Sequence, residues 1–417
     1  MRGYFVGAGL AIAVATMATS AMTTQVVAQS EIKIGEINSY SLLPAFTEPY
    51  RKGWQLAVEE INAAGGINGK KLVVISKDDG GKPADAQTAA NELVSSENVA
   101  MLTGTFLSNI GLAVSDFANQ KKVFFLAAEP LTDAITWSKG NRYTFRLRPS
   151  NYMQAAMLVE EAAKLPAKRW ATIAPNYEYG QSAVAVFKKL MSEKRPDIQW
   201  VDEQWPPQGK IDAGPVVQAV AAANPEAILN VTFGADLVKL VREGNTRGLF
   251  KGRTVVSFLT GEPEYLDPLK DETPEGWIVT GYPWYSIKTP EHEAFLKAYQ
   301  TKYNDYPRLG SIVGYQTIKA AAAILAKAGS TSPPRSCARA WARTCSPGTA
   351  SPKCSSTAPG ARRPRPSTTR CAPSSASSRS TSTAIPTRCC IRSMARAVPT
   401  CSTSTTTVPI TTSRPNS

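Results

Sequence analysis

The clearest candidate for binding chemistry is Gly104-Thr-Phe-Leu-Ser-Asn109, a short segment between a predicted strand and a predicted helix. The first N–H groups of a helix lack partners within the helix and carry partial positive charge, so they suit a carboxylate. Ser108 adds a hydroxyl there and Asn109 an amide. A Ser-Asn pair before a helix also serves as an ordinary N-cap. The segment therefore predicts either an anion site or a simple cap.

Further candidates follow predicted strands later in the chain. Glu262 and Glu264 come directly after one strand and offer carboxylates to a cation, although an exposed loop acid is an equally good interpretation of Glu262. Aromatic residues occupy comparable loops and the region after the last predicted strand: Tyr40, Phe46, Tyr179, Phe233, Tyr282, Trp284 and Tyr285. We expect about half of these rings to pack in the core and miss a ligand. Together they favour a larger or aromatic carboxylate.

The sequence before residue 331 offers few residues in patterns that support catalysis. The chain has a single histidine, His292, which follows Pro290-Glu291 at a predicted helix start and is expected to be a solvated surface residue. No Gly-x-Ser-x-Gly elbow occurs before residue 331, and Gly65-Gly-Ile-Asn-Gly-Lys70 follows a helix, so it is a turn and not a phosphate loop. The same part of the chain has no cysteine. We expect neither an enzyme nor a metal or cofactor site.

The elements that position these residues alternate between two hydrophobic periods. Strands are predicted at 31–38, 72–76, 99–103, 123–127, 170–174, 198–203, 227–231, 254–259 and 276–280. Helices are predicted from Pro49 to 64, and at 83–96, 109–120, 152–165, 181–193, 215–223, 235–243, 291–303 and 312–328. Strands separated by helices of this length predict right-handed βαβ units on parallel sheets.

The length of this series predicts two α/β lobes, since it exceeds one comfortable core. The first seam falls near Arg148-Pro149-Ser150. We expect an N-terminal lobe of residues 29–148 plus 284–329 and a C-terminal lobe of residues 149–283. Ligands of open parallel sheets bind where strand carboxyl ends face a crevice, so the site is expected between the lobes.

The chain resembles the periplasmic solute-binding proteins of the branched-chain amino acid type, which have the type I binding-protein fold and serve ABC importers. The residues that carry the resemblance are Ile32-Lys-Ile-Gly35, Gly53-Trp-Gln-Leu-Ala-Val-Glu-Glu-Ile-Asn-Ala-Ala-Gly-Gly-Ile-Asn-Gly69, Asp78-Asp79, Gly104 with Ser108, Tyr143-Thr-Phe-Arg-Leu-Arg-Pro149, Tyr179-Gly180 and Tyr315. The match covers about residues 31–330. It implies two Rossmann-like lobes joined by a hinge.

The resemblance also implies a ligand site. Its expected residues are Tyr40, Phe46, Ser108, Asn109, Ala128, Glu129, Tyr179, Phe233, Glu262, Tyr282 and Trp284. Ser108 matches a ligand hydroxyl, Tyr179 a ring lining the cleft, and Glu262 the carboxylate that meets a ligand ammonium in amino-acid binders. The chain departs from the family pattern where Glu129 and Leu131 replace small hydroxyl residues. This departure brings a plain amino-acid ligand into question.

The function implied is capture of a small carboxylate (an amino acid, amide or aromatic acid) by closure of the lobes, for an ABC importer. The expected partners are the ligand and inner-membrane permease subunits, with no nucleic acid, and the protein is expected to be a monomer. The alternative is the ligand-sensing part of a receptor or signalling system, which uses the same fold.

The N-terminus reads as a secretory signal peptide of residues 1–28. Arg2 precedes an apolar run from Phe5 to Ala18 that is too short to span a bilayer, and Val26-Val27-Ala28 offers a cleavage site before Gln29. These features predict export to the periplasm.

Residues 331–417 differ in composition from the rest of the chain. They contain all 7 cysteines and 13 of the 47 basic residues but no acidic residue, so the remainder, with 34 basic and 33 acidic residues, is almost neutral. The segment is made almost entirely of residues whose codons carry C or G in the middle position, as expected when a GC-rich gene is read one base out of register. We therefore interpret residues 330–417 as a disordered product of a frameshift, and the overall charge of +14 as no sign of nucleic-acid binding.

Overall fold

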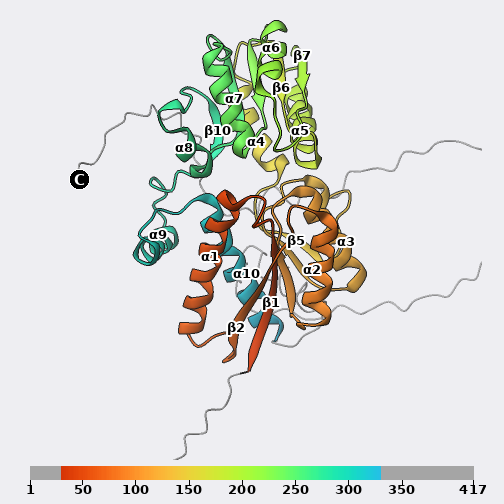
Figure 1. Ribbon diagram of the computed structural model, residues 1–417, viewed down its shortest axis with the longest axis vertical. Coiled ribbons are helices and arrows are strands. Elements are labelled where there is room, and N and C mark those ends of the chain that lie inside the picture. The colour runs from red at the N-terminus through yellow and green to blue at the C-terminus, as the bar shows by residue number, and fades with distance from the viewer. Residues whose placement is uncertain (1–29, 330–417) are drawn as a thin grey trace, which may run out of the picture.

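The structure is a computed structural model that describes residues 30–329. The predictions for residues 1–28 and 330–417 lie outside these residues. The described chain forms two lobes, each built on a five-stranded parallel sheet (Figure 1). The predicted two-lobed α/β fold is confirmed.

The first lobe contains β1 (Glu31–Asn38), β2 (Lys71–Asp78), β3 (Met101–Gly104), β4 (Phe125–Ala127) and β5 (Thr144–Arg146), in the order β2-β1-β3-β4-β5. Its connecting helices are α1 (Pro44–Ala63), α2 (Pro83–Ser95) and α3 (Ser108–Lys121), and a 3₁₀ turn, η1, spans Asp133–Ile135. The strand β5 was not predicted, because three residues carry too little alternation to be distinguished from a loop.

The second lobe contains β6 (Arg169–Ile173), β7 (Gln199–Gln204), β8 (Ala227–Asn230), β9 (Thr254–Gly261) and β10 (Ile278–Gly281), in the order β10-β9-β8-β6-β7. Its helices are α4 (Asn151–Ala162), α5 (Glu178–Lys194), α6 (Ala213–Ala222), α7 (Gly234–Thr246) and α8 (Pro263–Leu269), followed by the 3₁₀ turn η2 (Lys270–Glu272). Short α8 was not predicted. Both sheets thus repeat one topology, in which the strand that opens the lobe lies second from an edge.

The start of α1 differs from the prediction. The sequence placed Pro49 at the helix start, but α1 begins at Pro44, and Pro49 lies inside it. Proline suits the first helical position because its missing N–H has no partner there in any case. Two prolines five residues apart both fit this rule, and the structure uses the earlier one.

Helices α9 (Pro290–Tyr303) and α10 (Leu309–Ala328) pack against α1 of the first lobe (Figure 1). The crossing of α1 and α10 is close because glycines face each other's backbones. A Cβ atom on Gly53 would lie 1.9 Å from the carbonyl oxygen of Ser311, and one on Gly314 would lie 2.1 Å from that of Tyr50. Among the described residues α10 is the one helix long and apolar enough to cross a membrane, but it is half buried here as a core helix.

Candidate functional site

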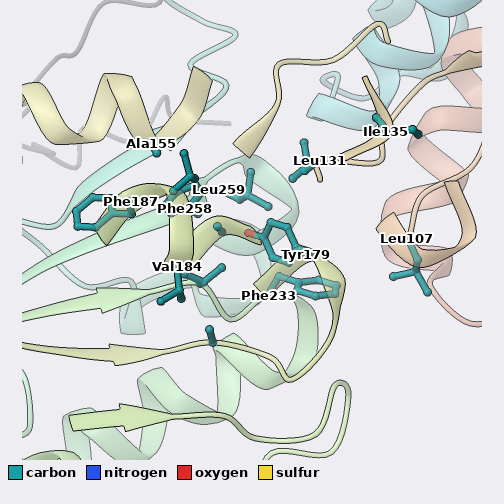
Figure 2. Packing of buried hydrophobic residues seen from close by; sticks show 14 of the residues in the cluster. Leu107, Leu131, Ile135, Ala155, Tyr179, Val184, Phe187, Phe233, Phe258 and Leu259 are labelled. Atoms are coloured by element: carbon teal, nitrogen blue, oxygen red, sulfur yellow. The ribbon is translucent and has the colours of Figure 1, made fainter. Parts of the chain in front are cut away.

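A small cavity lies where the two lobes meet. Its volume is about 20 Å³, which is room for about one water molecule. The wall is formed by residues of both lobes: Phe106, Ser108, Glu129, Leu131, Arg148, Tyr177, Tyr179, Phe233, Leu259 and Tyr265. In Figure 2, Tyr179 and Phe233 stand at the edge of the second lobe, and Leu131 approaches from the first. The lobes are therefore closed on their own side chains.

The turn between β3 and α3 places Ser108 in this wall. Gly104 has a φ of 102°, and a Cβ atom there would lie 2.3 Å from the carbonyl oxygen of Ile37, so the turn requires glycine. The N-cap of α3 is Leu107, without a side-chain cap hydrogen bond, and Ser108 is the first helical residue. The interpretation of Ser108 as an ordinary N-cap is therefore wrong.

The hydroxyl of Ser108 still has a proton to donate. Its oxygen accepts hydrogen bonds from the backbone N–H groups of Leu131, at 3.3 Å, and Thr132, at 3.2 Å. A hydroxyl is both donor and acceptor, so these two bonds leave its O–H available. Asn109, the next residue, is not part of the cavity wall, and its buried Oδ1 is an acceptor without a protein partner. At this end of the cavity the Ser108 hydroxyl is therefore the side-chain donor for an anion.

An ion pair joins the two lobes beside the cavity. Arg148, which follows β5, donates from Nη2 to Oε1 of Glu262, which follows β9. Its Nη1 lies 3.9 Å from Oε1 of Glu129, which follows β4. All three side chains are buried.

Burial dominates the titration of this group. Loss of water raises the pKa of Glu129 to about 8 against the opposing effect of the Arg148 charge. The pKa of Glu262 is raised by the same cause, again with Arg148 opposing. Burial raises the pKa of both acids to about 8, so only the contact with Arg148 distinguishes them: Glu262 accepts a hydrogen bond from the guanidinium and Glu129 does not. We therefore assign the negative charge of the ion pair to Glu262 and the proton to Glu129.

Glu264 has a different task from Glu262. Its carboxylate accepts hydrogen bonds from the backbone N–H groups of Leu309, at 3.1 Å, and Gly310, at 2.7 Å. These are orphan donors at the start of α10, where a negative charge is favourable. Glu264 thus fastens α8 of the second lobe to α10, whereas Glu262 accepts a hydrogen bond from Arg148 of the cavity wall.

Aromatic rings form the apolar part of the site. Phe46 of α1 packs against Phe106, Phe233 and Tyr265, with ring centroids 5.4, 6.4 and 5.3 Å apart. Tyr179 meets Phe233 edge to face at 5.8 Å, and its buried hydroxyl has no protein partner. The cluster joins both lobes and leaves one polar tip beside the cavity.

Seven of the eleven predicted site residues lie outside the cavity wall: Tyr40, Phe46, Asn109, Ala128, Glu262, Tyr282 and Trp284. The hydroxyl of Tyr40 donates to the buried Glu36 at 3.0 Å and accepts from Trp54 at 3.1 Å. Ala128 is buried, and its backbone bonds to Gly104 and Arg148. Trp284 stacks on Tyr306 at 5.1 Å, away from the cavity.

The expectation for His292 is wrong. Its side chain is only 7% exposed, and its Nε2 lies 2.6 Å from the hydroxyl of Tyr282. Burial lowers the pKa of His292, so the ring is neutral at physiological pH. Both residues pack at the base of α9 and neither lines the cavity. The pattern Pro-Glu-His at a helix start indicated the helix correctly but not what the histidine packs against.

The structure adds wall residues that sequence analysis did not name as ligand contacts: Phe106, Leu131, Arg148, Tyr177, Leu259 and Tyr265. All of them except Arg148 lie two or three positions from a predicted residue. Arg148 carried a usable signal, since a second arginine in Arg146-Leu-Arg148 at a lobe crossing has no obvious exposed role. Within residues 30–329, no group of His, Cys, Asp and Glu side chains is arranged to hold a metal ion.

Comparison with known proteins places this geometry in a family. A family model described as periplasmic binding protein matches residues 31–343. A Leu/Ile/Val-binding protein homologue (homolog 7) of Brucella suis biovar 1 is 28% identical over 306 residues, covering 69% of this chain and 75% of its own.

Solved structures show the same fold. A solute-binding protein of an ABC transporter from Rhodopseudomonas palustris BisB5, in complex with 3,4-dihydroxybenzoic acid, superposes with a TM-score of 0.67 at 22% identity, over 74% of this chain and 84% of its own. The branched-chain amino acid transporter substrate-binding protein LivJ of Streptococcus pneumoniae, in complex with isoleucine, superposes with a TM-score of 0.65 at 24% identity. The match covers 76% of this chain and 88% of its own. These relatives are binding proteins and not enzymes, and their family name implies a location outside the cytoplasm. Because the family model spans more than half of the sequence, the chain belongs to the periplasmic binding protein family.

Proposed function

We propose that this protein is the extracytoplasmic solute-binding component of an ABC importer, and that it captures a small carboxylate between its lobes. The observation that carries the proposal is the cavity itself. It joins the start of α3, a buried arginine and a cluster of aromatic rings at the meeting point of two parallel sheets. Helix starts and guanidinium groups bind carboxylates, and rings bind an apolar body.

Ligand entry requires the lobes to separate. The closed cavity holds no molecule larger than water, so a ligand such as an aromatic acid must displace the contacts that now fill the site. We propose a hinge whose crossings lie at residues 148–149 and 283–284, with the binding-competent lobes moving as rigid bodies. The permease subunits would then recognise the closed, loaded form of a monomer.

A thermal-shift screen tests the proposal. The full chain is heated with each member of a panel of amino acids, amides and aromatic acids. A ligand that binds only the folded state raises the free energy of unfolding, by about 2.7 kcal/mol at a hundred times its Kd, and therefore raises the melting temperature. Stabilisation by at least one small carboxylate supports the proposal. A panel without any stabiliser, together with stabilisation by an uncharged sugar, would assign the cavity to another class of solute.

A further inference from the structure

We propose that Arg148 is the built-in counter-ion of Glu262, and that the cavity therefore selects carboxylates that carry no amino group. This inference rests on the proposed function and narrows the ligand class of the same cavity. Its starting point is the position of Arg148, which lines the cavity from one lobe crossing while its guanidinium donates to a carboxylate of the second lobe.

Every carboxyl group at or beside this site already accepts hydrogen bonds or faces the Arg148 charge. Glu262 is engaged by Arg148, and Glu264 accepts backbone N–H groups at the start of α10. The remaining acid, Glu129, lies only 3.9 Å from the guanidinium, so an ammonium placed on it would lie beside another full positive charge. Like charges at this range repel strongly where water is excluded. An amino group on the ligand is therefore penalised.

A ligand carboxylate, in contrast, finds several donors. A guanidinium has five N–H donors, and Nη1 of Arg148 faces Glu129 at a distance too long for a hydrogen bond. Ser108 has an O–H to donate, as the hydrogen bonds to its oxygen show. Glu129 is largely protonated at neutral pH because burial raises its pKa, and its buried Oε2 has no protein partner. In that form it adds an O–H donor instead of a repelling charge.

The rest of the wall fits an apolar body. Phe106, Tyr177, Tyr179, Phe233 and Tyr265 surround the charged groups. The wall is not entirely apolar, because the buried hydroxyl of Tyr179 has no protein partner and offers a polar contact to the ligand body. A ring or branched chain with one carboxylate matches this combination of groups.

A competing explanation is that the Arg148–Glu262 pair only holds the lobes together. Such a bridge would change stability when it is removed, but it would leave the preference among ligands unaltered. The two explanations are separated by ligands that differ in the amino group alone.

Calorimetric titrations of the full chain with three matched pairs provide this test. The pairs are phenylacetate and phenylglycine, 3-phenylpropanoate and phenylalanine, and 4-methylpentanoate and leucine. Each pair shares its carboxylate and apolar body, so the ratio of the two Kd values measures the effect of the ammonium. For the pair that binds best, we expect the acid to bind at least tenfold more tightly than the amino acid.

Substitutions assign the preference to Arg148. Arg148→Met removes the cation but keeps much of the side-chain length, so acid binding should weaken at least tenfold and the preference should shift towards the amino acid. Arg148→Lys keeps a positive charge and should keep the order of preference with weaker binding. If Arg148→Met does not fold, Glu262→Gln is decisive, because it leaves the Arg148 charge uncompensated and should strengthen acid binding at least threefold.

Two results would overturn the inference while leaving the proposed function intact. One is a wild-type protein that binds the amino acid of the best pair more tightly than the acid. The other is a folded Arg148→Met variant with the wild-type ratio of Kd values. If the wild type binds no member of any pair, the carboxylate-binding function and this inference both fail.

Discussion

Ser108 and Arg148 both line the cavity, but one offers an uncharged donor and the other a positive charge. The serine has one O–H left after accepting two backbone bonds, whereas the arginine brings a full charge already balanced by Glu262. An uncharged donor contributes to affinity without setting the ligand's charge. At the residue scale, we therefore assign affinity to Ser108 and charge selection to Arg148.

Replacing Ser108 with alanine should weaken ligand binding by about 1.5–3 kcal/mol, the usual effect of losing a hydrogen bond to a charged group. Titration calorimetry measures the change in Kd. Ser115→Ala is the matched control, because Ser115 is buried on the same helix and its hydroxyl bonds to Thr144 at 2.8 Å, away from the cavity. The control should lower the melting temperature and leave Kd unchanged. Equal Kd values in both variants would remove Ser108 from the site.

A second prediction at the residue scale concerns pH and Glu36. Burial raises the pKa of this acid from 4.5 to about 8, against hydrogen bonds from Ser76 and Tyr40. Between these values the folded state binds more protons than the unfolded state, so stability falls as pH rises from about 5 to 8. Glu36→Gln cannot ionise, and its melting temperature should fall less over this range than that of the wild type.

The control for this pH series is Asp197→Asn. Interaction with Arg195 lowers the pKa of the exposed Asp197 to about 2, so this acid is ionised throughout the range from pH 5 to 8 in both states. The melting temperature of Asp197→Asn should therefore change with pH as much as that of the wild type. A Glu36→Gln variant that also runs parallel would show that Glu36 is ionised when folded.

At the scale of elements, the sequence predicted long strands and amphipathic helices well and short elements poorly. Hydrophobic periodicity located β1, α2 and α5 to within a few residues, because each presents a continuous buried face. It missed β5 and α8, whose three and seven residues are held by neighbours distant in sequence. The site followed the same rule. Ser108 and Glu129 follow strands and were found, whereas the pairing of Arg148 with Glu262 depends on tertiary structure.

The crossing of α1 and α10 provides a prediction about elements. Gly314→Ala should destabilise the protein by about 1–3 kcal/mol, because the added methyl group meets the Tyr50 carbonyl and forces the helices apart. Gly214→Ala in α6 is the control, since its Cβ would lie 3.6 Å from the nearest atom and alanine favours helix by about 1 kcal/mol. Denaturant unfolding measures both. An unchanged free energy of unfolding in Gly314→Ala would mean that the two helices cross less closely.

At the scale of the whole molecule, the second lobe leaves one side of its sheet open within residues 30–329. β10 is an edge strand that pairs with β9, and its residues are only half buried. Unpaired strand edges and half-buried apolar residues gain stability when another segment covers them. If residues 331–417 are a frameshift product, the segment in the correct frame could cover this edge and stabilise the second lobe.

Restoring the reading frame by one base near codon 331 should therefore raise the melting temperature. The corrected sequence would contain acidic residues, which the present segment lacks, and more large apolar residues than the few that it has. Thermal unfolding of the two chains side by side measures the difference, and sequencing codons 325–340 of the gene shows whether the base is missing. A corrected chain that melts at the same or a lower temperature would contradict the hypothesis.

The most direct test of the account is a calorimetric titration of the full chain with the carboxylate that stabilises it best. We expect one ligand per chain, with a Kd near micromolar, which corresponds to a binding free energy of about −8 kcal/mol, and clearly weaker binding by the Ser108→Ala variant. A titration without heat at several temperatures, or binding at several sites that Ser108→Ala leaves unchanged, would contradict the claim that the interlobe cavity captures a small carboxylate.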